Sequence, residues 1–318
     1  MRIVVVGAGG IGGWLGAHLG QAGHDVSFLV RRATLDALRE GGLTVIRENG
    51  EVEARLVSPV ASEDARELAA PGYADVVVLA TKVGSVPALL PAVTTLTGPG
   101  TVILTTQNGL VAPEIVADAV GRERVLPGVV RVYTQVVRRG LILHTGGLGS
   151  LTTGEWDGGT SARVRALVEV LDGAGVRAWA NEDIWVELWK KVAFVAPQGG
   201  LGAAVDAPIG GLRTTYRDAY AAMVAEVAAV AAAQGCPLDH DVVAEVLAMA
   251  DSQPAEATTS MQRDVATGLP SELDAQVMAI SRAGDEVGVP TPVFDVVGAV
   301  LAPREAAARE EAAARAGR

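Results

Sequence analysis

The N-terminus of the chain places a short apolar strand directly before a glycine-rich turn. Residues 3–6 are apolar, and Gly7, Gly9 and Gly12 follow them in the spacing G-x-G-x-x-G, after which apolar residues recur at helical spacing. In a strand–turn–helix unit these glycines allow a tight turn, close approach of the backbone to a pyrophosphate, and packing of the helix on the strand. The motif predicts a Rossmann-type dinucleotide site, with a purely structural glycine turn as the alternative. The predicted cofactor-binding residues of the turn are Gly7, Ala8, Gly9, Gly10, Ile11 and Gly12.

The remaining patterns predict an α/β fold with two domains. Apolar runs and turn residues indicate strands at 25–30, 75–80, 101–105 and 176–180, a hairpin over 43–57, antiparallel strands within 128–154 and a helix at 162–171. From 181 onward helical patterns prevail, at 184–196, 219–233, 240–250, 271–287 and 293–301. We therefore expect an N-terminal Rossmann-type doubly wound sheet over 1–180 and an all-helical, substrate-binding domain over 181–318. The polar segment 302–318 is predicted to be a solvated helix or a frayed tail.

Composition excludes several classes of protein. The chain has 26 Lys and Arg against 37 Asp and Glu, a net charge of −11, which argues against nucleic acid or an anionic membrane as a partner. No apolar run is long enough to suggest a membrane span, and the single cysteine, Cys236, fits a reducing cytoplasm. The four histidines show no metal-ligand spacing, so no metal is expected. We predict a cytoplasmic protein with a small-molecule partner, and a homodimer is compatible with the sequence.

Residues that follow the predicted strands indicate the kind of dinucleotide. Arg31 and Arg32 follow the second strand, where a carboxylate would bind the ribose 2′-hydroxyl of NAD, while Asp25 comes too early in that strand. The arginines favour NADP(H) through contacts with the 2′-phosphate and leave NAD as a second candidate, unless both are simply solvated charges. Thr81-Lys82 and Asn108 follow later strands, at the sheet edge where ligands bind, and are predicted to contact the cofactor. An amide and an ammonium there can hold ribose, nicotinamide or substrate oxygens, and the alternatives are a helix cap and a surface lysine.

A lysine in the first helix of the C-terminal half is the candidate acid. Helical geometry places Lys191 at the margin of an apolar stripe that includes Leu188 and Val195, whereas Lys190 projects toward the opposite side. An ammonium near apolar surface is less well solvated, which favours release of its proton. The alternative is a structural lysine whose stem packs on that surface while its charge stays in water.

Several of these motifs occur together in one order along the chain: Gly7-x-Gly9-x-x-Gly12, Arg31, Thr81-Lys82, Gln107-Asn108-Gly109, Trp189-x-Lys191, Ser260-Met261 and Glu272. In this the sequence resembles the ketopantoate reductase (2-dehydropantoate 2-reductase) family, over essentially the whole chain to about Leu301. The resemblance implies a Rossmann domain that binds NADPH and a helical domain that closes over a 2-oxo acid.

The resemblance also implies roles for single residues. Lys191 would give the proton to the carbonyl oxygen as the nicotinamide delivers hydride to the carbon, and Glu272 would hold Lys191 or a neighbouring water. Ser260 would contact the substrate carboxylate. Asn108 would lie between nicotinamide and substrate, and Lys82 would orient the ribose or the carbonyl side. A cation beside the oxygen that gains charge stabilises the transition state more than the ground state.

The chain departs from the family at several substrate positions. Where members that act on ketopantoate have asparagines, this chain has Val195, Gly199 and Ile209, and Val277-Met278 stands in place of an Asn-Gly pair. We expect Val195, Gly199 and Ile209 to form a less polar substrate site, in which a hydroxyl group of the substrate would gain no hydrogen bond from these residues. The sequence therefore predicts an NADPH-dependent reductase of a 2-oxo acid, or of a related carbonyl compound or imine. The substrate is expected to have a branched, apolar or aromatic side chain, and ketopantoate remains one candidate.

Two other functions fit the same residues. One is a D-2-hydroxy acid dehydrogenase of this family, for which NADH is an acceptable cofactor. The other belongs to a different class, a non-catalytic NADP-binding sensor whose helical half binds a partner. Loss of NADPH oxidation in a Lys191→Ala variant would argue against the sensor.

Overall fold

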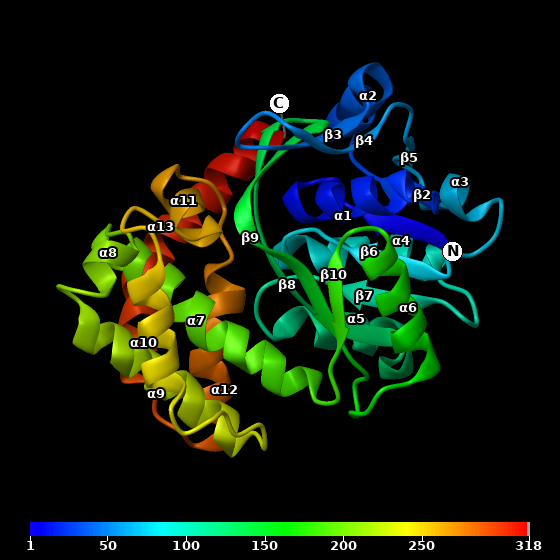
Figure 1. Ribbon diagram of the computed structural model, residues 1–318. Coiled ribbons are helices and arrows are strands. Elements are labelled where there is room, and N and C mark those ends of the chain that lie inside the picture. Colours follow the sequence, from blue (N-terminus) through cyan, green and yellow to red (C-terminus); the bar gives the residue numbers. More distant parts are fainter. Residues whose placement is uncertain (317–318) are drawn as a thin grey trace. The chain divides into compact units, whose positions relative to one another are not determined.

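The computed structural model describes residues 1–316, which form two compact units. The N-terminal unit comprises Met1–Gln107 and Ala112–Ile184, and the C-terminal unit comprises Asn108–Val111 together with the chain from Trp185 onward. In Figure 1 the colours follow the sequence, from blue at the N-terminus to red at the C-terminus. Asn108–Val111 therefore belongs to the C-terminal unit, although the residues on either side of it belong to the N-terminal one.

Parallel strands form the centre of the N-terminal unit. They lie in the order β5-β2-β1-β6-β7-β8, and each pair of neighbours among them is parallel. This is the Rossmann order, in which the direction of winding reverses between β1 and β6 and ligands bind beyond the carboxyl ends of those strands. The strands are β1 (Arg2–Val6), β2 (Asp25–Leu29), β5 (Val60–Ser62), β6 (Val76–Leu79), β7 (Val102–Thr105) and β8 (Val125–Arg138).

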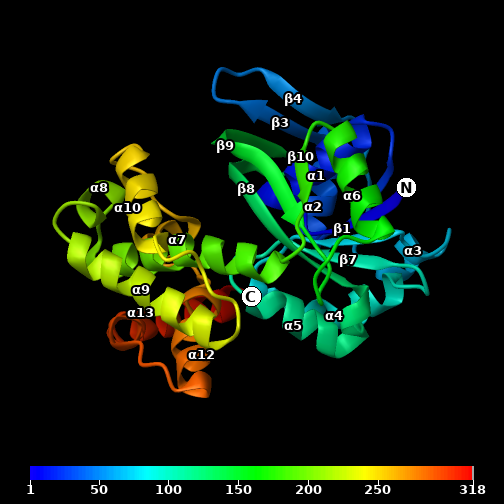
Figure 2. The ribbon, with the colours of Figure 1, turned by 60° about the horizontal axis from the view of Figure 1, so that its bottom comes forward.

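Helices cover both faces of these strands (Figure 2). In β1, Ile3 and Val5 belong to one apolar cluster while Val4 and Val6 belong to another, because successive side chains of a strand point to opposite faces. The first cluster includes residues of α1, α2 and α6, and the second includes residues of α3, α4 and α5. These helices are α1 (Gly10–Gln21), α2 (Arg32–Gly41), α3 (Ala65–Ala69), α4 (Val86–Leu96), α5 (Val111–Val120) and α6 (Ala162–Gly173).

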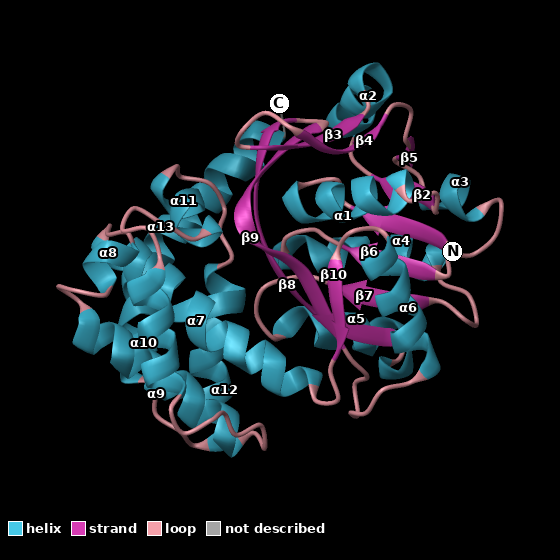
Figure 3. Ribbon diagram, viewed as in Figure 1, coloured by secondary structure: helices cyan, strands magenta, loops and turns pink. Residues whose placement is uncertain are grey.

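An extension with both antiparallel and parallel strand pairs continues the sheet beyond β8. The long strands β8 and β9 (Leu141–Thr153) pair antiparallel, and β9 also pairs with β3 (Leu43–Arg47) and β10 (Arg177–Ala180). The predicted hairpin is confirmed, since β3 pairs antiparallel with β4 (Val52–Leu56). Figure 3 shows the long strands and the neighbouring hairpin in magenta.

A polar cluster lies buried beneath α1. Glu53 on β4 contacts His18 through Oε1 (3.1 Å) and His144 through Oε2 (2.8 Å), and both histidines are buried. The ring of Trp14 meets both imidazoles edge-on. The cluster therefore joins α1, β4 and β9 through one carboxylate.

The C-terminal unit is helical and packs on small residues. A Cβ at Gly200 on α7 would lie 2.9 Å from Val277 Cγ2 and 3.2 Å from Val297 Cγ1, so glycine allows the close approach of three segments. Glu226 on α9 accepts hydrogen bonds from the N–H groups of Val293 and Phe294, at the start of α13. The helices are α7 (Ile184–Val205), α8 (Ile209–Leu212), α9 (Arg217–Ala233), α10 (Val242–Ser252), α11 (Ser260–Ala266), α12 (Ala279–Val287) and α13 (Pro292–Ala316).

The predicted α/β fold with a helical C-terminal region is confirmed, but several of its elements differ. Helix α2 and strand β5 were not predicted, because each has few apolar residues. Helix α7 continues through Pro197 to Val205, so the prediction that it ends at 196 was wrong. Proline removes one backbone hydrogen bond, yet the helix continues, and Gly199 and Gly200 beyond it pack closely against other segments.

Two further differences concern the segment from 271 onward. The regular helix expected over 271–287 begins with a π-helical turn, η3 (Asp274–Met278), in which the N–H of Ala279 donates to Asp274 five residues before it. The segment 302–318 was predicted to be a solvated helix or a frayed tail, and residues 302–316 continue helix α13. The prediction of solvation was wrong for the first part, where Glu305 and Ala308 are buried, and residues 317–318 lie outside the described residues. Glu305 is buried and accepts hydrogen bonds from the backbone and side chain of Ser271. Within residues 1–316, no helix is both long enough and apolar enough to cross a bilayer.

Candidate active site

The glycine turn has the geometry that its sequence predicted. Gly7 has a φ of +97°, which disfavours any residue with a side chain. A Cβ at Gly12 would overlap the carbonyl oxygen of Gly7, so the helix approaches the strand as closely as it does only because Gly12 has none. A Cβ at Gly9 would meet nothing within 4 Å. The glycine at this position thus leaves open space beside the N-terminus of α1, where phosphate groups are stabilised.

The end of β6 lies against this turn. A Cβ at Gly7 would lie 2.7 Å from the methyl group of Thr81. The hydroxyl oxygen of Thr81 is buried and has no hydrogen-bond partner among the described residues. Gln107 holds the same edge, because its Nε2 donates to the carbonyl oxygens of Leu79 (2.9 Å) and Thr81 (3.0 Å). The open space at Gly9 and the unpaired hydroxyl of Thr81 fit a dinucleotide bound at the switch point between β1 and β6.

The two arginines after β2 differ in their surroundings. Arg32 pairs with Asp36 over 3.1 Å and lies 3.9 Å from Glu63. Arg31 is exposed at the N-cap of α2 and is not paired with any described acidic residue. Arg31 is therefore the arginine whose guanidinium is available to an anion. Lys82 is exposed at the N-cap of the 3₁₀ turn η1 (Val83–Ser85).

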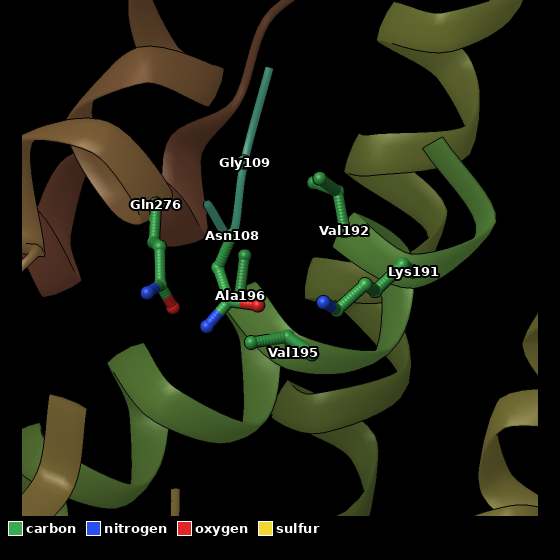
Figure 4. Close-up of a pocket in the computed structure, with 7 residues that line it drawn as sticks. All are labelled: Asn108, Gly109, Lys191, Val192, Val195, Ala196 and Gln276. Carbon is green, nitrogen blue, oxygen red and sulfur yellow. The ribbon is translucent and has the colours of Figure 1, made fainter. Parts of the chain in front are cut away.

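A pocket in the C-terminal unit gathers residues from three distant segments. Figure 4 shows the amine of Lys191 and the amides of Asn108 and Gln276 pointing into it, with Val195 beside them. Lys191 and Val195 come from α7, Gln276 comes from η3, and Asn108 follows β7 along the chain. The lining residues are Asn108, Gly109, Lys191, Val192, Val195, Ala196 and Gln276.

Close backbone packing positions Asn108 in this pocket. Gly109 has a φ of +92°, and a Cβ there would lie 2.7 Å from the carbonyl oxygen of Ala275 on η3. Glycine therefore lets the Asn108 segment pack directly on the π-helical turn. Gln276, on the same turn, donates from Nε2 to Oε2 of Glu272 over 3.0 Å. The structure thus links Glu272 to the pocket through Gln276.

The two adjacent lysines of α7 have different environments. Lys190 forms an ion pair with Asp239 over 2.7 Å at the surface, and this hydrogen bond raises the pKa of Lys190 despite partial desolvation. Lys191 lines the pocket among valine and alanine side chains. Lys190 thus projects away from the apolar stripe, as predicted, and of the two lysines it is Lys191 that lines the pocket.

Comparison with known proteins identifies the family. The family model "Ketopantoate reductase PanE/ApbA" matches residues 3–158, and the model of its C-terminal domain matches residues 183–305. The chain belongs to the ketopantoate reductase family. It is therefore an oxidoreductase that acts on a C=O or CH–OH group with a nicotinamide cofactor, and the resemblance inferred from the motifs is confirmed.

Alignments with relatives of known structure or assigned name extend over nearly the whole chain. A 2-dehydropantoate 2-reductase from Mesorhizobium japonicum is 33% identical over 95% of this chain and 97% of its own length. The crystal structure of a 2-dehydropantoate 2-reductase from Geobacter metallireducens matches with a TM-score of 0.87 at 28% identity, over 95% of this chain and 99% of that one. A D-mandelate dehydrogenase in complex with NADH and anilino(oxo)acetate matches with a TM-score of 0.86 at 25% identity, over 97% of this chain and 99% of that one.

This ketopantoate reductase homologue has other residues where its family has substrate asparagines. These residues do not all lie in the same part of the structure. Val195 lines the pocket. Gly199 lies next to it, since a Cβ there would be 3.7 Å from Oε1 of Gln276. Ile209 is fully buried in the core of the helical unit, outside the lining, and Val277 is buried in that core as well.

Other residues singled out from the sequence lie elsewhere or were missed. Ser260 is exposed at the first position of α11, whose N-cap is Thr259, and it does not belong to the lining. Gln276 was overlooked, although a glutamine within the apolar run 275–278, four residues after Glu272, is the signal that could have found it. Among residues 1–316, no group of three His, Cys, Asp or Glu side chains is arranged to hold a metal ion.

Proposed function

We propose that this protein reduces a 2-oxo acid to a 2-hydroxy acid with NADPH, in a pocket less polar than that of reductases acting on ketopantoate. The single observation that carries the proposal is the amine of Lys191 directed into a pocket that also holds the amide of Asn108. These are the cation and the hydrogen-bond donor that a carbonyl oxygen needs as it gains negative charge.

The proposed chemistry divides between the cofactor and the protein. The nicotinamide, when bound, supplies a hydride for the carbonyl carbon. Lys191 binds the carbonyl oxygen, gives it a proton as the C–O double bond becomes single, and recovers a proton from solvent afterwards. Asn108 donates an N–H to the substrate, and Glu272, held by Gln276, completes the polar group around the reacting end.

The choice of NADPH rests on Arg31. Its guanidinium follows β2, where a 2′-phosphate lies in Rossmann folds, and it is not occupied by an acidic neighbour as Arg32 is. No described carboxylate stands at residues 31–34 to bind a ribose 2′-hydroxyl instead. An anion there is stabilised by charge-assisted hydrogen bonds.

The proposed substrate follows from the lining. Val192, Val195 and Ala196 give the pocket apolar walls. Gly199 brings no amide, and a Cβ there would already lie 3.2 Å from Met261 Cε and from Thr259 Oγ1. Such walls favour a branched, apolar or aromatic side chain through burial of apolar surface. The match to a D-mandelate dehydrogenase with NADH favours one second candidate, a D-2-hydroxy acid dehydrogenase that uses NADH.

A substrate panel tests the proposal. Purified protein is given NADPH or NADH with ketopantoate, 3-methyl-2-oxobutanoate, 4-methyl-2-oxopentanoate, phenylpyruvate and phenylglyoxylate, and oxidation of the nucleotide is followed at 340 nm. We expect NADPH to be preferred and at least one branched or aromatic acid to be reduced faster than ketopantoate. Ketopantoate turned over faster than every other acid would overturn the altered pocket, and a preference for NADH would favour the second candidate.

A further inference from the structure

A second cavity in the C-terminal unit lies at the end of α7. It is lined by the last residues of α7, by the segment that leads into α8, by α11 and by one residue of α13. It shares no lining residue with the pocket of Lys191. Its volume is about 150 Å³, and a cavity of that size in another protein accommodates a molecule as large as benzene. The second cavity can therefore hold one small organic ligand.

Asp206 brings a carboxylate without a partner to this cavity. It directly follows α7, is exposed, and has a φ of +50°, whereas the other described residues with positive φ are all glycines. Side chains are disfavoured in this conformation, although Asp adopts it more readily than most residues. The carboxylate also stands at a helix C-terminus, whose partial charge is negative, and it has no hydrogen bond or ion pair with a described residue. A positively charged group of a ligand would offset this repulsion.

Two arginines bring positive charge to the same cavity. Arg304 of α13 donates from Nη1 to the carbonyl oxygen of Ala203 over 3.3 Å. Arg263 of α11 donates from Nη1 to the carbonyl and hydroxyl oxygens of Thr258, over 2.8 and 3.3 Å. These bonds hold the side chains and leave most of their N–H donors for other partners. Since neither arginine is paired with a described acidic residue, both guanidinium groups are available to a carboxylate.

The three charged side chains together favour a ligand that carries both signs of charge. A simple anion would be repelled by Asp206, and a simple cation would be repelled by Arg263 and Arg304. A molecule with an ammonium and a carboxylate group on one carbon atom avoids both repulsions. Other walls of the cavity include Ala207 and Val265, on which a small apolar group can pack.

We propose that this second cavity is a binding site for a small α-amino acid. The ammonium group of the amino acid binds the carboxylate of Asp206, and its carboxylate binds the guanidinium groups of Arg263 and Arg304. The site is separate from the pocket of Lys191, and its occupancy does not depend on the proposed reduction of a 2-oxo acid.

Isothermal titration calorimetry with the purified protein tests this proposal. The ligands are glycine, L-alanine, L-serine and L-valine, and the amino acid that binds most tightly is compared with its amide and with the acid that lacks its amino group. We expect that amino acid to bind with a Kd of about 1 mM or lower, and each analogue to bind at least about tenfold more weakly. If no amino acid reaches this affinity, or if either analogue binds as tightly, the proposal is wrong.

Two variants test the roles of the charges. Asp206→Asn removes the negative charge and keeps a residue that tolerates positive φ, and Arg304→Gln removes one positive charge. We expect each to weaken binding of the amino acid about tenfold, while Asp218→Asn, at an exposed residue of α9 outside the lining, leaves the affinity unchanged. Losses of less than about twofold in both Asp206→Asn and Arg304→Gln would contradict the proposed contacts.

An α-amino acid also resembles a 2-oxo acid, so the pocket of Lys191 has to be tested as its place. Lys191→Ala should leave the affinity unchanged, because Lys191 lies outside the second cavity. A loss of about tenfold in Lys191→Ala, with none in Asp206→Asn, would place the amino acid in that pocket and reject the proposal. Thermal unfolding establishes that each variant is folded. The titrations contain no nucleotide and no 2-oxo acid, so failure of the proposed reduction would leave their outcome unaffected.

Discussion

The glycine turn of the N-terminal unit and the pocket of the C-terminal unit are built in different ways. The turn is made of backbone from one short segment, and its glycines act through the side chains that they lack. The pocket is made of side chains from segments that the sequence separates by many residues. A site of the first kind can be found by its spacing, whereas a site of the second kind depends on how helices pack. Substitutions in the two sites should therefore have different effects on turnover and on cofactor binding.

The largest effect is expected in the pocket. Lys191→Ala removes the proposed proton donor, so kcat should fall by about 10²- to 10⁴-fold, while NADPH still binds because the glycine turn is intact. Steady-state rates and fluorescence titration with NADPH measure the two quantities. The matched control is Lys190→Ala, which breaks only the surface pair with Asp239 and should change kcat by less than about twofold. Undiminished turnover in Lys191→Ala would favour another donor or a non-catalytic protein.

A substitution in the glycine turn should affect binding of the cofactor. Gly9→Ala adds a methyl group that meets no protein atom within 4 Å, but it occupies the space that a pyrophosphate needs. The Kd for NADPH should rise at least about tenfold, which is about 1.4 kcal/mol, while the protein loses less than about 1 kcal/mol of stability. Gly173→Ala, at another glycine with open space around its Cβ, should leave the Kd unchanged. Unaltered affinity in Gly9→Ala would place the cofactor elsewhere.

A smaller effect should distinguish the two arginines. Arg31→Ala should weaken binding of NADPH about tenfold and that of NADH by less than about twofold, since only NADPH carries the 2′-phosphate. Arg32→Ala serves as the control, because its charge is already paired with Asp36. Titration of each variant with both nucleotides gives the four affinities. Equal losses in the two arginine variants would contradict the assignment of Arg31.

The smallest effect concerns stability rather than binding. Burial by itself would raise the pKa of Glu53, but the hydrogen bond with His144 and the charges of His144, His18 and Arg47 together lower that pKa. A carboxyl with a lowered folded-state pKa stabilises the protein above its unfolded pKa, here 4.5, and this contribution is lost as the pH falls through the folded value. Glu53→Gln should therefore cost about 1–2 kcal/mol at pH 7.

Urea unfolding between pH 7 and pH 3.5 measures this contribution. The difference between the wild-type protein and Glu53→Gln should shrink toward the acid end of the range. Glu48→Gln, at an exposed residue of the same hairpin, should match the wild-type protein throughout. A Glu53→Gln variant as stable as the wild-type protein at pH 7 would mean that the His18–Glu53–His144 cluster adds no net stability.

The sequence predicted those features that depend on local backbone geometry. The turn at Gly7, the hairpin around Asn49-Gly50 and the apolar parallel strands each need particular residues within a few positions of one another. The sequence did not predict that α7 continues through Pro197, because a proline is a local signal for the end of a helix and the packing of α7 against distant segments is not visible in it. The buried carboxylate of Glu305 was also missed, since its partner Ser271 lies on a distant segment.

The candidate site shows the same limit. Lys191 and Asn108 were singled out from their motifs, and the structure brings them together in one pocket with Val195. Spacing along the chain could not show that Ile209 is buried in the core or that Ser260 is exposed outside the lining. Gln276 escaped notice because no motif marks it, although its position four residues after Glu272 places the two side chains on one face of a helix.

The π-helical turn η3 also affects how this protein should be aligned with its relatives. Such a turn commonly arises when one residue is inserted into an α-helix, and the residues after it are rotated by about 100° relative to those before it. Gln276 keeps the four-residue helical hydrogen bond to Glu272, so the rotation affects the residues after the turn. Counting positions from Glu272 past Ala279 in a homologue without the insertion would therefore assign the wrong side chains to the places on α12. Superposition of the backbones, rather than residue spacing, is the sound basis for comparing substrate preferences across such homologues.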